Sequence, residues 1–463
     1  MNRREFLKGT AWMLAAAEAA GCADFMLGGG SSLMGFRCAP IERIRVGLVG
    51  LGMRGGWAAE RLAKIPGLEI VALCDIREEC IASAKERIAK SGGKVPERIH
   101  TGPEGYKALC ESDLDVVYIA TPWLLHAPIG LYALNSGKHA FIEVPAATTL
   151  DHCWELVETA ERRRLHCMML ENSGYGEDEL FFVSLVKHGL IGEVVHAEGG
   201  YLHNLTAECW ARPGEHHHYQ GNWRLEHNAV HQGDYYATHQ VQPIAWEMDI
   251  NRGDRLDYLV SVESGQFGFE AYAREHFPEG APERGRRIAM GDVNIAVART
   301  VRGRSVIIQH DVSTPRPYSR INIVTGTRGV LQEFPLPARV ALTDRSGAGA
   351  HQWADEAKMK ELRERYTHPL WKQAKEIVTR VGGHGGKDFL MDLRWAYCLH
   401  NGLPLDMDVY DLATWCAFGE LTERSVRGGS CRVEFPDFTR GCWRTAKPTG
   451  MFEFDLAKLK MKS

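Results

Sequence analysis

Residues 44 to 172 alternate short apolar runs with amphipathic segments, and this alternation constrains the fold more than any other feature of the chain. Strands that alternate with helices form βαβ units on a parallel sheet. We therefore predict one doubly wound domain over this range. Strands are expected at 44–50, 68–75, 115–122, 139–145 and 166–172, and helices at 53–64, near 126–135 and at 150–164.

The first predicted strand is followed by three glycines in the spacing GxGxxG: Gly50, Gly52 and Gly55. The motif opens a predicted helix, and Asp75 ends the next strand, 20 residues after Gly55. In this context the glycines let the backbone approach a pyrophosphate, and Asp75 accepts hydrogen bonds from an adenosine ribose. The alternative is a tight turn that binds no ligand. We expect NAD rather than NADP, because a 2'-phosphate would meet the charge of Asp75, a preference that the nearby Arg77 moderates.

A nicotinamide cofactor implies hydride transfer, for which the protein supplies orientation and acid–base groups. Ligands of such sheets bind at the carboxyl ends of the strands. Further cofactor contacts are therefore expected at residues 121–126, at Glu143 and Val144, and at Asn172. For Trp123 and Leu124 a second interpretation is equally open, in which they are ordinary hydrophobic residues of a loop.

The chain is longer than one ordinary domain, and from about residue 193 the pattern changes to longer β runs. Turn residues at 302–304 and 326–329 fit an antiparallel meander. The predicted fold is α/β followed by α+β: a Rossmann dinucleotide-binding domain and then an open, mainly antiparallel sheet that forms a substrate domain. The outer face of this sheet is expected to be covered, for example by a second subunit in a homo-oligomer. The expected ranges are 1–40 for an export signal and linker, 41–172 for the Rossmann domain, 173–340 for the open-sheet domain, and 341–463 for a mixed helical and irregular segment that packs on both.

Composition excludes several classes of protein. Lys and Arg (55) nearly balance Asp and Glu (59), and no long basic run occurs, so we expect no nucleic-acid partner. Twelve cysteines without a CxxC pair are too dilute for a disulfide scaffold. No membrane span is expected, and the predicted partner is a small molecule.

The amino terminus carries Arg3 and Arg4, followed by an apolar, Ala-rich stretch to Ala20. This pattern resembles a bacterial twin-arginine export signal, and we expect a periplasmic protein. The sequence AAGC, which ends at Cys22, leaves open a lipid anchor at that cysteine. An unprocessed basic terminus is the alternative.

Seven histidines lie within 37 residues, which raises the question of a metal site. The glutamate of an HExxH motif is absent and no cysteine partner is near, so we predict no metal. His239 ends a polar, aromatic run and begins an apolar helical segment, where a side chain can point into a cleft; a capping or core role is the alternative. The histidines are His203, His216, His217, His218, His227, His231 and His239, and the role of the run from 216 to 218 stays open.

The segment ATPWLLHAPIGLYALNSGKHAFIEVP (120–145) resembles the Gfo/Idh/MocA oxidoreductases, whose members join a Rossmann domain to an open-sheet substrate domain. Those dehydrogenases usually carry Lys after the Glu, where this chain has Val144. Further blocks resemble glycoside hydrolase family 109, whose members are NAD-dependent α-N-acetylgalactosaminidases. These blocks include CMMLENSGY (167–175), NWRLEHNAVHQGDYYATHQVQPIA (222–245) and PDFTRGCW (436–443), and the resemblance covers roughly residues 40 to 445.

The resemblance also implies site residues. Within it, His239, Tyr236 and Tyr201 are the candidates for proton transfer; without it, Tyr201 and Tyr318 are read as core or sheet aromatics. The sequence HQVQP (239–243) replaces a more glycine-rich HGLGP, so Gln240 and Gln242 are expected to alter the pocket. The implied cofactor contacts, beside the three glycines, are Met53, Arg54, Asp75, Trp123, Leu124, Leu125, His126, Glu143, Val144 and Asn172. The implied substrate contacts are Tyr201, Arg224, Tyr236, Ala237, Thr238, His239 and Tyr318.

The implied reaction oxidises the carbon 3 hydroxyl of the sugar to a ketone, which makes the carbon 2 proton acidic. A base removes that proton, the anomeric substituent is expelled, water adds to the enone, and the hydride returns to carbon 3. This route differs from the usual two-carboxylate glycosidase, as another NAD-dependent family does. The first alternative is a net sugar dehydrogenase, which Val144 disfavours, as does Tyr235 at a position where dehydrogenases typically carry Asp. The second alternative is a non-catalytic NAD- and sugar-binding protein.

Overall fold

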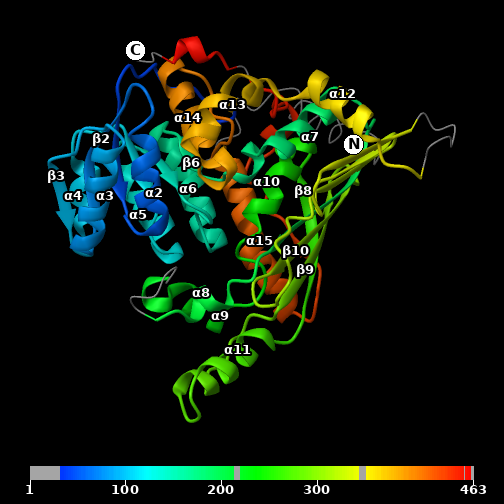
Figure 1. Ribbon diagram of the computed structural model, residues 1–463, viewed down its shortest axis with the longest axis horizontal. Coiled ribbons are helices and arrows are strands. Elements are labelled where there is room, and N and C mark those ends of the chain that lie inside the picture. The colour runs from blue at the N-terminus through cyan, green and yellow to red at the C-terminus, as the bar shows by residue number, and fades with distance from the viewer. Residues whose placement is uncertain (1–31, 213–218, 344–350, 453, 460–463) are drawn as a thin grey trace, which may run out of the picture.

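The computed structural model describes residues 32–212, 219–343, 351–452 and 454–459. Two sheets dominate this part of the chain, and helices surround the first sheet and pack between the two (Figure 1). No helix within the described residues is both long enough and apolar enough to cross a membrane.

The first sheet has six strands in the order β3-β2-β1-β4-β5-β6, and all neighbours are parallel. The order reverses between β1 and β4, which is where doubly wound sheets bind their ligands. The predicted Rossmann fold is confirmed. The strands are β1 (Ile44–Val49), β2 (Leu68–Asp75), β3 (Arg98–Thr101), β4 (Val116–Ile119), β5 (His139–Ile142) and β6 (Cys167–Met169).

The helices of this half have identifiable start and stop signals. The Thr149 hydroxyl accepts a hydrogen bond from the His152 backbone N–H (3.1 Å) where α6 begins, and Arg164 ends the helix in the left-handed region at φ 55°. The segment 78–111, for which no element was predicted, contains two helices and β3. The helices are α2 (Met53–Leu62), α3 (Glu78–Lys90), α4 (Gly105–Glu111), α5 (His126–Asn135), α6 (Leu150–Arg163) and the short η1 (Trp123–Leu125).

The second sheet has eight strands in the order β13-β12-β11-β7-β10-β9-β8-β14. Two antiparallel meanders, β8-β9-β10 and β11-β12-β13, flank β7, which runs parallel to β10. The sheet is therefore mainly antiparallel, as predicted, with one parallel pair at its centre. The strands are β7 (Val194–Leu202), β8 (Leu256–Glu263), β9 (Val293–Thr300), β10 (Ser305–Asp311), β11 (Ile323–Gly326), β12 (Gly329–Gln332), β13 (Arg339–Leu342) and β14 (Val433–Glu434).

The two faces of this sheet differ. Helix α10 (Thr238–Glu247) packs against β7, and α15 (Val409–Arg427) packs against β8, so the inner face is covered. Along β9 the side chains alternate between buried and exposed. Ile295 and Val297 point outward and are 41% and 46% exposed, and Val262 lies opposite Ile295 on β8. The outer face therefore presents apolar side chains to solvent.

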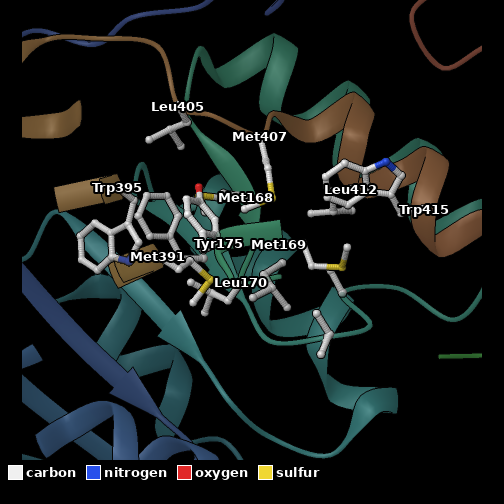
Figure 2. Close-up of a cluster of buried hydrophobic side chains, with 14 of the residues drawn as sticks. Met168, Met169, Leu170, Tyr175, Met391, Trp395, Leu405, Met407, Leu412 and Trp415 are labelled. Carbon is white, nitrogen blue, oxygen red and sulfur yellow. The ribbon is translucent and has the colours of Figure 1, made fainter. Parts of the chain in front are cut away.

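Segments far apart in the sequence share one core where the two halves meet. Figure 2 shows Met168 and Met169 of β6 among side chains from α14 (Lys387–Asn401) and α15. Helix α14 also packs on α2, and α15 on α6, so the C-terminal helices contact both halves. The Asp408 and Asp411 side chains form a capping box at the start of α15.

A second, smaller cluster of buried apolar side chains lies apart from this core. It joins β7 to α8, α9 and α11, with Trp210 against Phe277 at 5.4 Å between ring centroids. The remaining helices are α7 (Glu177–Lys187), α8 (Thr206–Trp210), α9 (Trp223–Val230), α11 (Gly268–His276), α12 (Glu356–Tyr366) and α13 (Pro369–Val381). Short 3-10 turns are η2 (Ser173–Tyr175), η3 (Gln220–Asn222), η4 (Pro282–Gly285), η5 (His384–Gly386), η6 (Cys442–Arg444) and η7 (Leu456–Lys458).

Candidate functional site

The turn between β1 and α2 needs glycine for steric reasons. Gly50 has φ +85°, and a Cβ there would lie 2.6 Å from the Ala120 carbonyl oxygen. A Cβ at Gly55 would lie 1.8 Å from the Gly50 carbonyl oxygen. At Gly52 the nearest atom to such a Cβ is the Arg77 Nη2, at 3.6 Å, so the loop is open on this side. The arrangement fits a phosphate group at the start of α2.

Asp75 ends β2 beside this turn, and its carboxylate is fixed by two backbone N–H groups. Leu51 donates to Oδ2 (2.6 Å) and Arg77 donates to Oδ1 (2.9 Å). The Arg77 guanidinium lies farther away, with Nε 3.8 Å from Oδ1. A carboxylate has about four acceptor positions, so Asp75 keeps capacity for ribose hydroxyls.

A cavity of about 300 Å³ runs from this turn toward the second half of the molecule. We call its two ends the glycine-loop end (Gly50, Gly52, Asp75 and Arg77) and the aromatic end (Trp123, Trp223, Arg224 and Tyr236). Other sequence-predicted residues that line it are Met53, Arg54, Leu125, His126, Glu143 and Val144.

The aromatic end is built around a buried arginine. The Trp123 and Tyr236 rings stack with centroids 5.6 Å apart, and the Arg224 guanidinium lies 5.0 Å and 4.7 Å from those centroids. Arg224 donates to the Tyr219 hydroxyl (3.4 Å), and within the described chain its Nε has no partner and its guanidinium forms no ion pair. A buried cation held by aromatic rings can bind an oxygen of a bound molecule.

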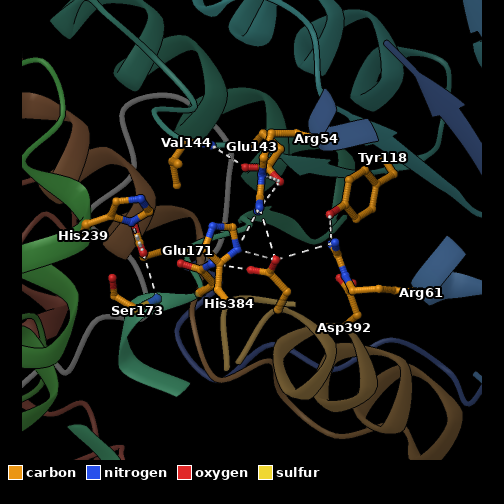
Figure 3. A network of polar contacts seen from close by, with 12 residues as sticks. Arg54, Arg61, Tyr118, Glu143, Val144, Glu171, Ser173, His239, His384 and Asp392 are labelled. Carbon is orange, nitrogen blue, oxygen red and sulfur yellow. Dashed lines mark hydrogen bonds and ion pairs between the residues drawn. The ribbon is translucent and has the colours of Figure 1, made fainter. Parts of the chain in front are cut away.

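His239 does not line the cavity itself, but its ring lies 4.7 Å from that of Tyr236, and a carboxylate orients it. Its Nδ1 is 2.5 Å from the Glu171 Oε1, which also accepts from the Ser173 backbone N–H (2.9 Å) (Figure 3). Burial lowers the pKa of His239 to about 4, although the charge of Glu171 opposes this shift. Burial would raise the pKa of the Glu171 carboxyl, but His239 and the Ser173 N–H hold it below its usual range. The pair is therefore a neutral imidazole on an ionised carboxylate, with Nε2 left as a proton acceptor.

A second polar network surrounds Arg54 on the other side of the same region (Figure 3). The Arg54 Nε donates to the Glu143 Oε1 (3.0 Å), and its Nη1 donates to the Asp388 Oδ2 (3.2 Å). That Asp388 oxygen also lies 2.7 Å from the Nδ1 of His384. Burial alone would raise the pKa of Asp388, but Arg54, the His384 hydrogen bond and Arg61 hold it well below its usual range.

Several predicted site residues lie outside the cavity lining, and His239, Tyr201 and Tyr318 are among them. Leu124 is 63% exposed, and Gly55 packs within the turn. Asn172 reaches Arg54 only through Asp388, to which its side-chain amide donates. Ala237 and Thr238 are buried at the start of α10.

The two remaining tyrosines, Tyr201 and Tyr318, lie in different settings. Tyr201 is buried, with its ring 5.5 Å from that of His239 and 4.8 Å from that of Tyr236. Tyr318 is 44% exposed, lies edge-on to His203, and accepts a hydrogen bond from the Arg320 Nε (2.5 Å). The structure thus brings Tyr201, Tyr236 and His239 into one cluster.

Gln240 and Gln242, the departures noted in the sequence, point away from the cavity. Gln240 donates to the Asp234 Oδ2 (2.9 Å), and Gln242 is fully buried against the 171–174 loop. Tyr235 also points away, because its hydroxyl donates to the Glu423 carboxylate (2.5 Å). Val144 lines the cavity at the position of the expected Lys.

The remaining histidines do not gather around one point. His227 and His231 stack at 4.3 Å between ring centroids, and His231 pairs with Glu423 (3.0 Å). In the described residues no group of three or more His, Cys, Asp or Glu side chains is arranged to hold a metal ion. The run from 216 to 218 lies outside the described residues, as do Arg3, Arg4 and Cys22.

Sequence reasoning missed Glu171, His384 and Asp388. Glu171 follows a buried strand and reads as its end, and nothing local links it to His239. His384 stands in the sequence GGHGG, where four glycines adopt positive φ angles. That glycine pattern was the signal for a turn that presents a half-exposed imidazole.

The comparisons with known proteins agree with this geometry. Residues 44–171 match the model of the oxidoreductase family with an NAD-binding Rossmann fold, and residues 175–445 match the glycosyl hydrolase 109 C-terminal domain. A glycosyl hydrolase family 109 protein of Porphyromonas gingivalis is 44% identical over 88% of this chain and 87% of its own length. An alpha-N-acetylgalactosaminidase of Bacteroides fragilis is 42% identical over 89% of this chain and 96% of its own. A solved levoglucosan dehydrogenase in complex with NADH has the same fold, with a TM-score of 0.66 and 18% identity over 85% of this chain and all of its own.

Proposed function

We propose that this chain, which belongs to glycosyl hydrolase family 109 and is an NAD-dependent glycoside hydrolase, cleaves terminal α-N-acetylgalactosamine from glycosides. The observation that carries the proposal is His239, whose ring lies 4.7 Å from that of Tyr236 at the aromatic end of the NAD cavity and whose Nδ1 is bound to Glu171. The similar protein of that name in Bacteroides fragilis supports the choice of sugar.

The cavity fits NAD. Gly52 leaves room at the start of α2 for the pyrophosphate, and Asp75 can accept from the adenosine ribose. Arg54, Glu143 and Val144 line the space between these groups and the aromatic end, where the nicotinamide would lie. When bound there, NAD would supply the hydride acceptor for oxidation at carbon 3 of the sugar and the hydride donor for its re-reduction.

The protein's own groups carry the protons. A ketone at carbon 3 makes the carbon 2 proton acidic, and the His239 Nε2 is placed to accept it because Nδ1 donates to Glu171. Tyr201 and Tyr236 close the site around this imidazole, and Arg224 offers a charged donor to an oxygen of the substrate.

Expulsion of the anomeric substituent needs a second proton carrier. His384 is a second imidazole whose Nδ1 faces a carboxylate, that of Asp388 (2.7 Å), and it lies beside Arg54. Because it is half exposed, it can exchange protons with solvent directly. We expect His384 to donate a proton to the leaving group.

The test is hydrolysis in heavy water without added NAD. Purified protein should cleave an aryl α-N-acetylgalactosaminide and leave deuterium at carbon 2 of the released sugar, provided that His239 exchanges its proton with solvent. A substrate deuterated at carbon 3 should react more slowly where hydride removal limits the rate. Direct displacement at the anomeric carbon predicts neither effect, and their joint absence would overturn the redox route.

The same assay separates the alternatives. A net dehydrogenase would release a keto-sugar and stop after one equivalent without added NAD, but Val144 stands where its Lys would be and Tyr235 faces Glu423. A non-catalytic binding protein has no turnover for the Tyr236 and His239 variants to lose. Denatured protein should also release one nicotinamide per chain if the cofactor stays bound between turnovers.

We also propose export by the twin-arginine route to the periplasm, based on Arg3, Arg4 and the apolar stretch to Ala20. Cys22 is the candidate for a lipid anchor. Replacing both arginines with Lys should keep the precursor in the cytoplasm. Unchanged periplasmic recovery would refute this route.

The outer face of the second sheet suggests a homo-oligomer. Val262, Ile295 and Val297 expose apolar surface there, and a second copy of the chain can bury it. Sedimentation of the protein and of a Val297→Lys variant tests this proposal, because a charge in the interface should shift the equilibrium toward monomer. A monomeric parent protein at micromolar concentration would contradict it.

A further inference from the structure

Helix α10 faces the loop after β6 with two side chains one turn apart, His239 and Gln242. The loop, residues 171–174, connects the last strand of the first sheet to α7. His239 contacts the carboxylate of Glu171, whereas Gln242 contacts backbone groups of the loop and also donates to the Met407 Sδ (2.9 Å).

Gln242 fixes the loop at two points. Its Nε2 donates to the Glu171 carbonyl (3.1 Å), and its Oε1 accepts from the Gly174 N–H (2.5 Å). A Cβ at Gly174 would lie 2.9 Å from the Gln242 Cδ and from the Trp246 ring, so the loop and helix pack as closely as glycine allows. The Glu171 backbone is therefore held by the same helix that carries His239.

The Glu171 carboxylate is fully buried, and its contacts are unequal. Oε1 accepts from His239 and from the Ser173 N–H, while Oε2 has no hydrogen-bond partner in the described chain. A buried carboxylate with one oxygen unpaired is costly for stability alone. Its one side-chain partner is the imidazole.

We propose that Glu171 is a positioning residue that fixes the tautomer and orientation of His239, and that Gln242 holds Glu171 in place. The inference deepens the proposed function, on which it rests for the assignment of a proton transfer to His239. An ionised carboxylate accepts only, so Nδ1 carries the hydrogen and Nε2 keeps its lone pair. The carboxylate also stabilises the imidazolium that forms when Nε2 takes a proton.

The other charged groups near His239 act in the opposite direction. Arg320 and Lys387 both disfavour a protonated imidazole, and burial does so most strongly. The Tyr201 ring is tilted against the imidazole of His239, and the Tyr236 ring meets it edge-on. Glu171 is thus the group that favours proton uptake. Glu179 on α7 and Glu333 after β12 line a small cavity together with His239. The other titratable or charged groups around His239 are Glu171 on the loop after β6, Arg320 before β11, Lys387 on α14, Tyr201 on β7 and Tyr236 before α10.

The experiment compares Glu171→Gln with Glu171→Asp and with Glu423→Gln. The last variant is a matched control, because Glu423 also binds a histidine, His231, away from the NAD cavity. Glu171→Gln should lower kcat by about 10²- to 10⁴-fold with little change in KM, and move the acid limb of the pH profile to lower pH. Glu171→Asp keeps the charge and should recover at least tenfold of the loss. Glu423→Gln should keep kcat within about threefold.

Nitrogen NMR of histidine-labelled protein supplies a readout that does not depend on turnover. His239 should show Nδ1–H and an unprotonated Nε2 in the parent protein, and a changed or mixed tautomer in Glu171→Gln. An unchanged tautomer, or a kcat within threefold of the parent with the same acid limb, would overturn the inference. Equal losses in Glu171→Gln and Glu423→Gln would also overturn it. If the parent protein shows neither carbon 2 exchange nor a carbon 3 isotope effect, the proposed function fails, and the tautomer still decides the role of Glu171.

Discussion

The glycine-loop end and the aromatic end share one cavity, yet the chain builds them in different ways. The first comes from one continuous unit, β1, α2 and β2, in which backbone N–H groups fix the Asp75 carboxylate. The second brings together η1, α9 and the start of α10, and the carboxylate behind His239 comes from the loop after β6. A contiguous unit binds a cofactor that many proteins share, whereas the assembled end sets the chemistry. Substitutions at the aromatic end should therefore change kcat, and substitutions at the glycine-loop end should change the Kd of NAD.

The largest effect is expected at the aromatic end. His239→Ala should lower kcat by about 10²- to 10⁴-fold, because a general base is removed, and should leave the amount of bound NAD unchanged. Steady-state rates and the nicotinamide released on denaturation measure both quantities. His231→Ala, which alters an imidazole bound to Glu423, is the control. A near-normal rate in His239→Ala would move the role to Tyr201, Tyr236 or Tyr318.

Asp75→Ala tests the glycine-loop end. The loss of a carboxylate that faces the ribose should weaken NAD binding by about 1 to 3 kcal/mol, or roughly 5- to 150-fold in Kd. Titration of NAD into cofactor-free protein measures this change. At saturating NAD, kcat should stay close to that of the parent. A loss of kcat that NAD cannot restore would show that the two ends are not separable.

The pH profile sharpens the contrast between the two ends. Burial lowers the pKa of His239 to about 4, so the imidazole is neutral and able to accept a proton at any pH well above that value. We expect kcat/KM to fall about tenfold per unit as pH drops below about 4, where an ordinary histidine would give a limb near 6.5. The limb should be absent from the residual activity of His239→Ala. A limb near 6.5 that survives this substitution would assign it to another group.

Arg77→Ala should give the smallest change. Its guanidinium is 3.8 Å from Asp75 and partly exposed, so the ion pair contributes about 0 to 1 kcal/mol. NAD affinity should change by less than about fivefold, because the backbone N–H that holds Asp75 remains. Titration as for Asp75→Ala measures it. A change as large as that of Asp75→Ala would mean that Arg77 binds the cofactor itself.

Much of the fold could be predicted because it is encoded locally. β1 and β2 are apolar runs with turn signals at their ends, and α6 has a threonine cap, so their limits are visible in the sequence. Helix α3 was missed because charged residues dominate it and few of its side chains are buried. The central position of β7, parallel to β10, depends on long-range pairing that no local pattern records.

The candidate site also contains residues that the sequence predicts and residues that it does not. Gly50, Gly52 and Asp75 follow from a spacing rule, and the structure places all three on the cavity. Glu171 and Gln242 could not be inferred, because their function depends on a contact between a loop and a helix 68 residues apart. Gln242 looked like a pocket residue in the sequence, yet its buried amide holds the loop instead.

The ion pairs of α2 set an order on the synthesis of the chain. Once residue 169 has left the ribosome, all six strands of the first sheet are available to pair. Arg61 at that moment lacks Asp392 of α14, which accepts from its Nε (2.8 Å), whereas Arg54 already has Glu143. A buried guanidinium without a counter-charge is unfavourable, so we expect α2 to pack fully against the sheet only after α14 has emerged. A chain truncated before residue 388 would keep Gly50, Gly52 and Asp75 but would lack the counter-charge of Arg61.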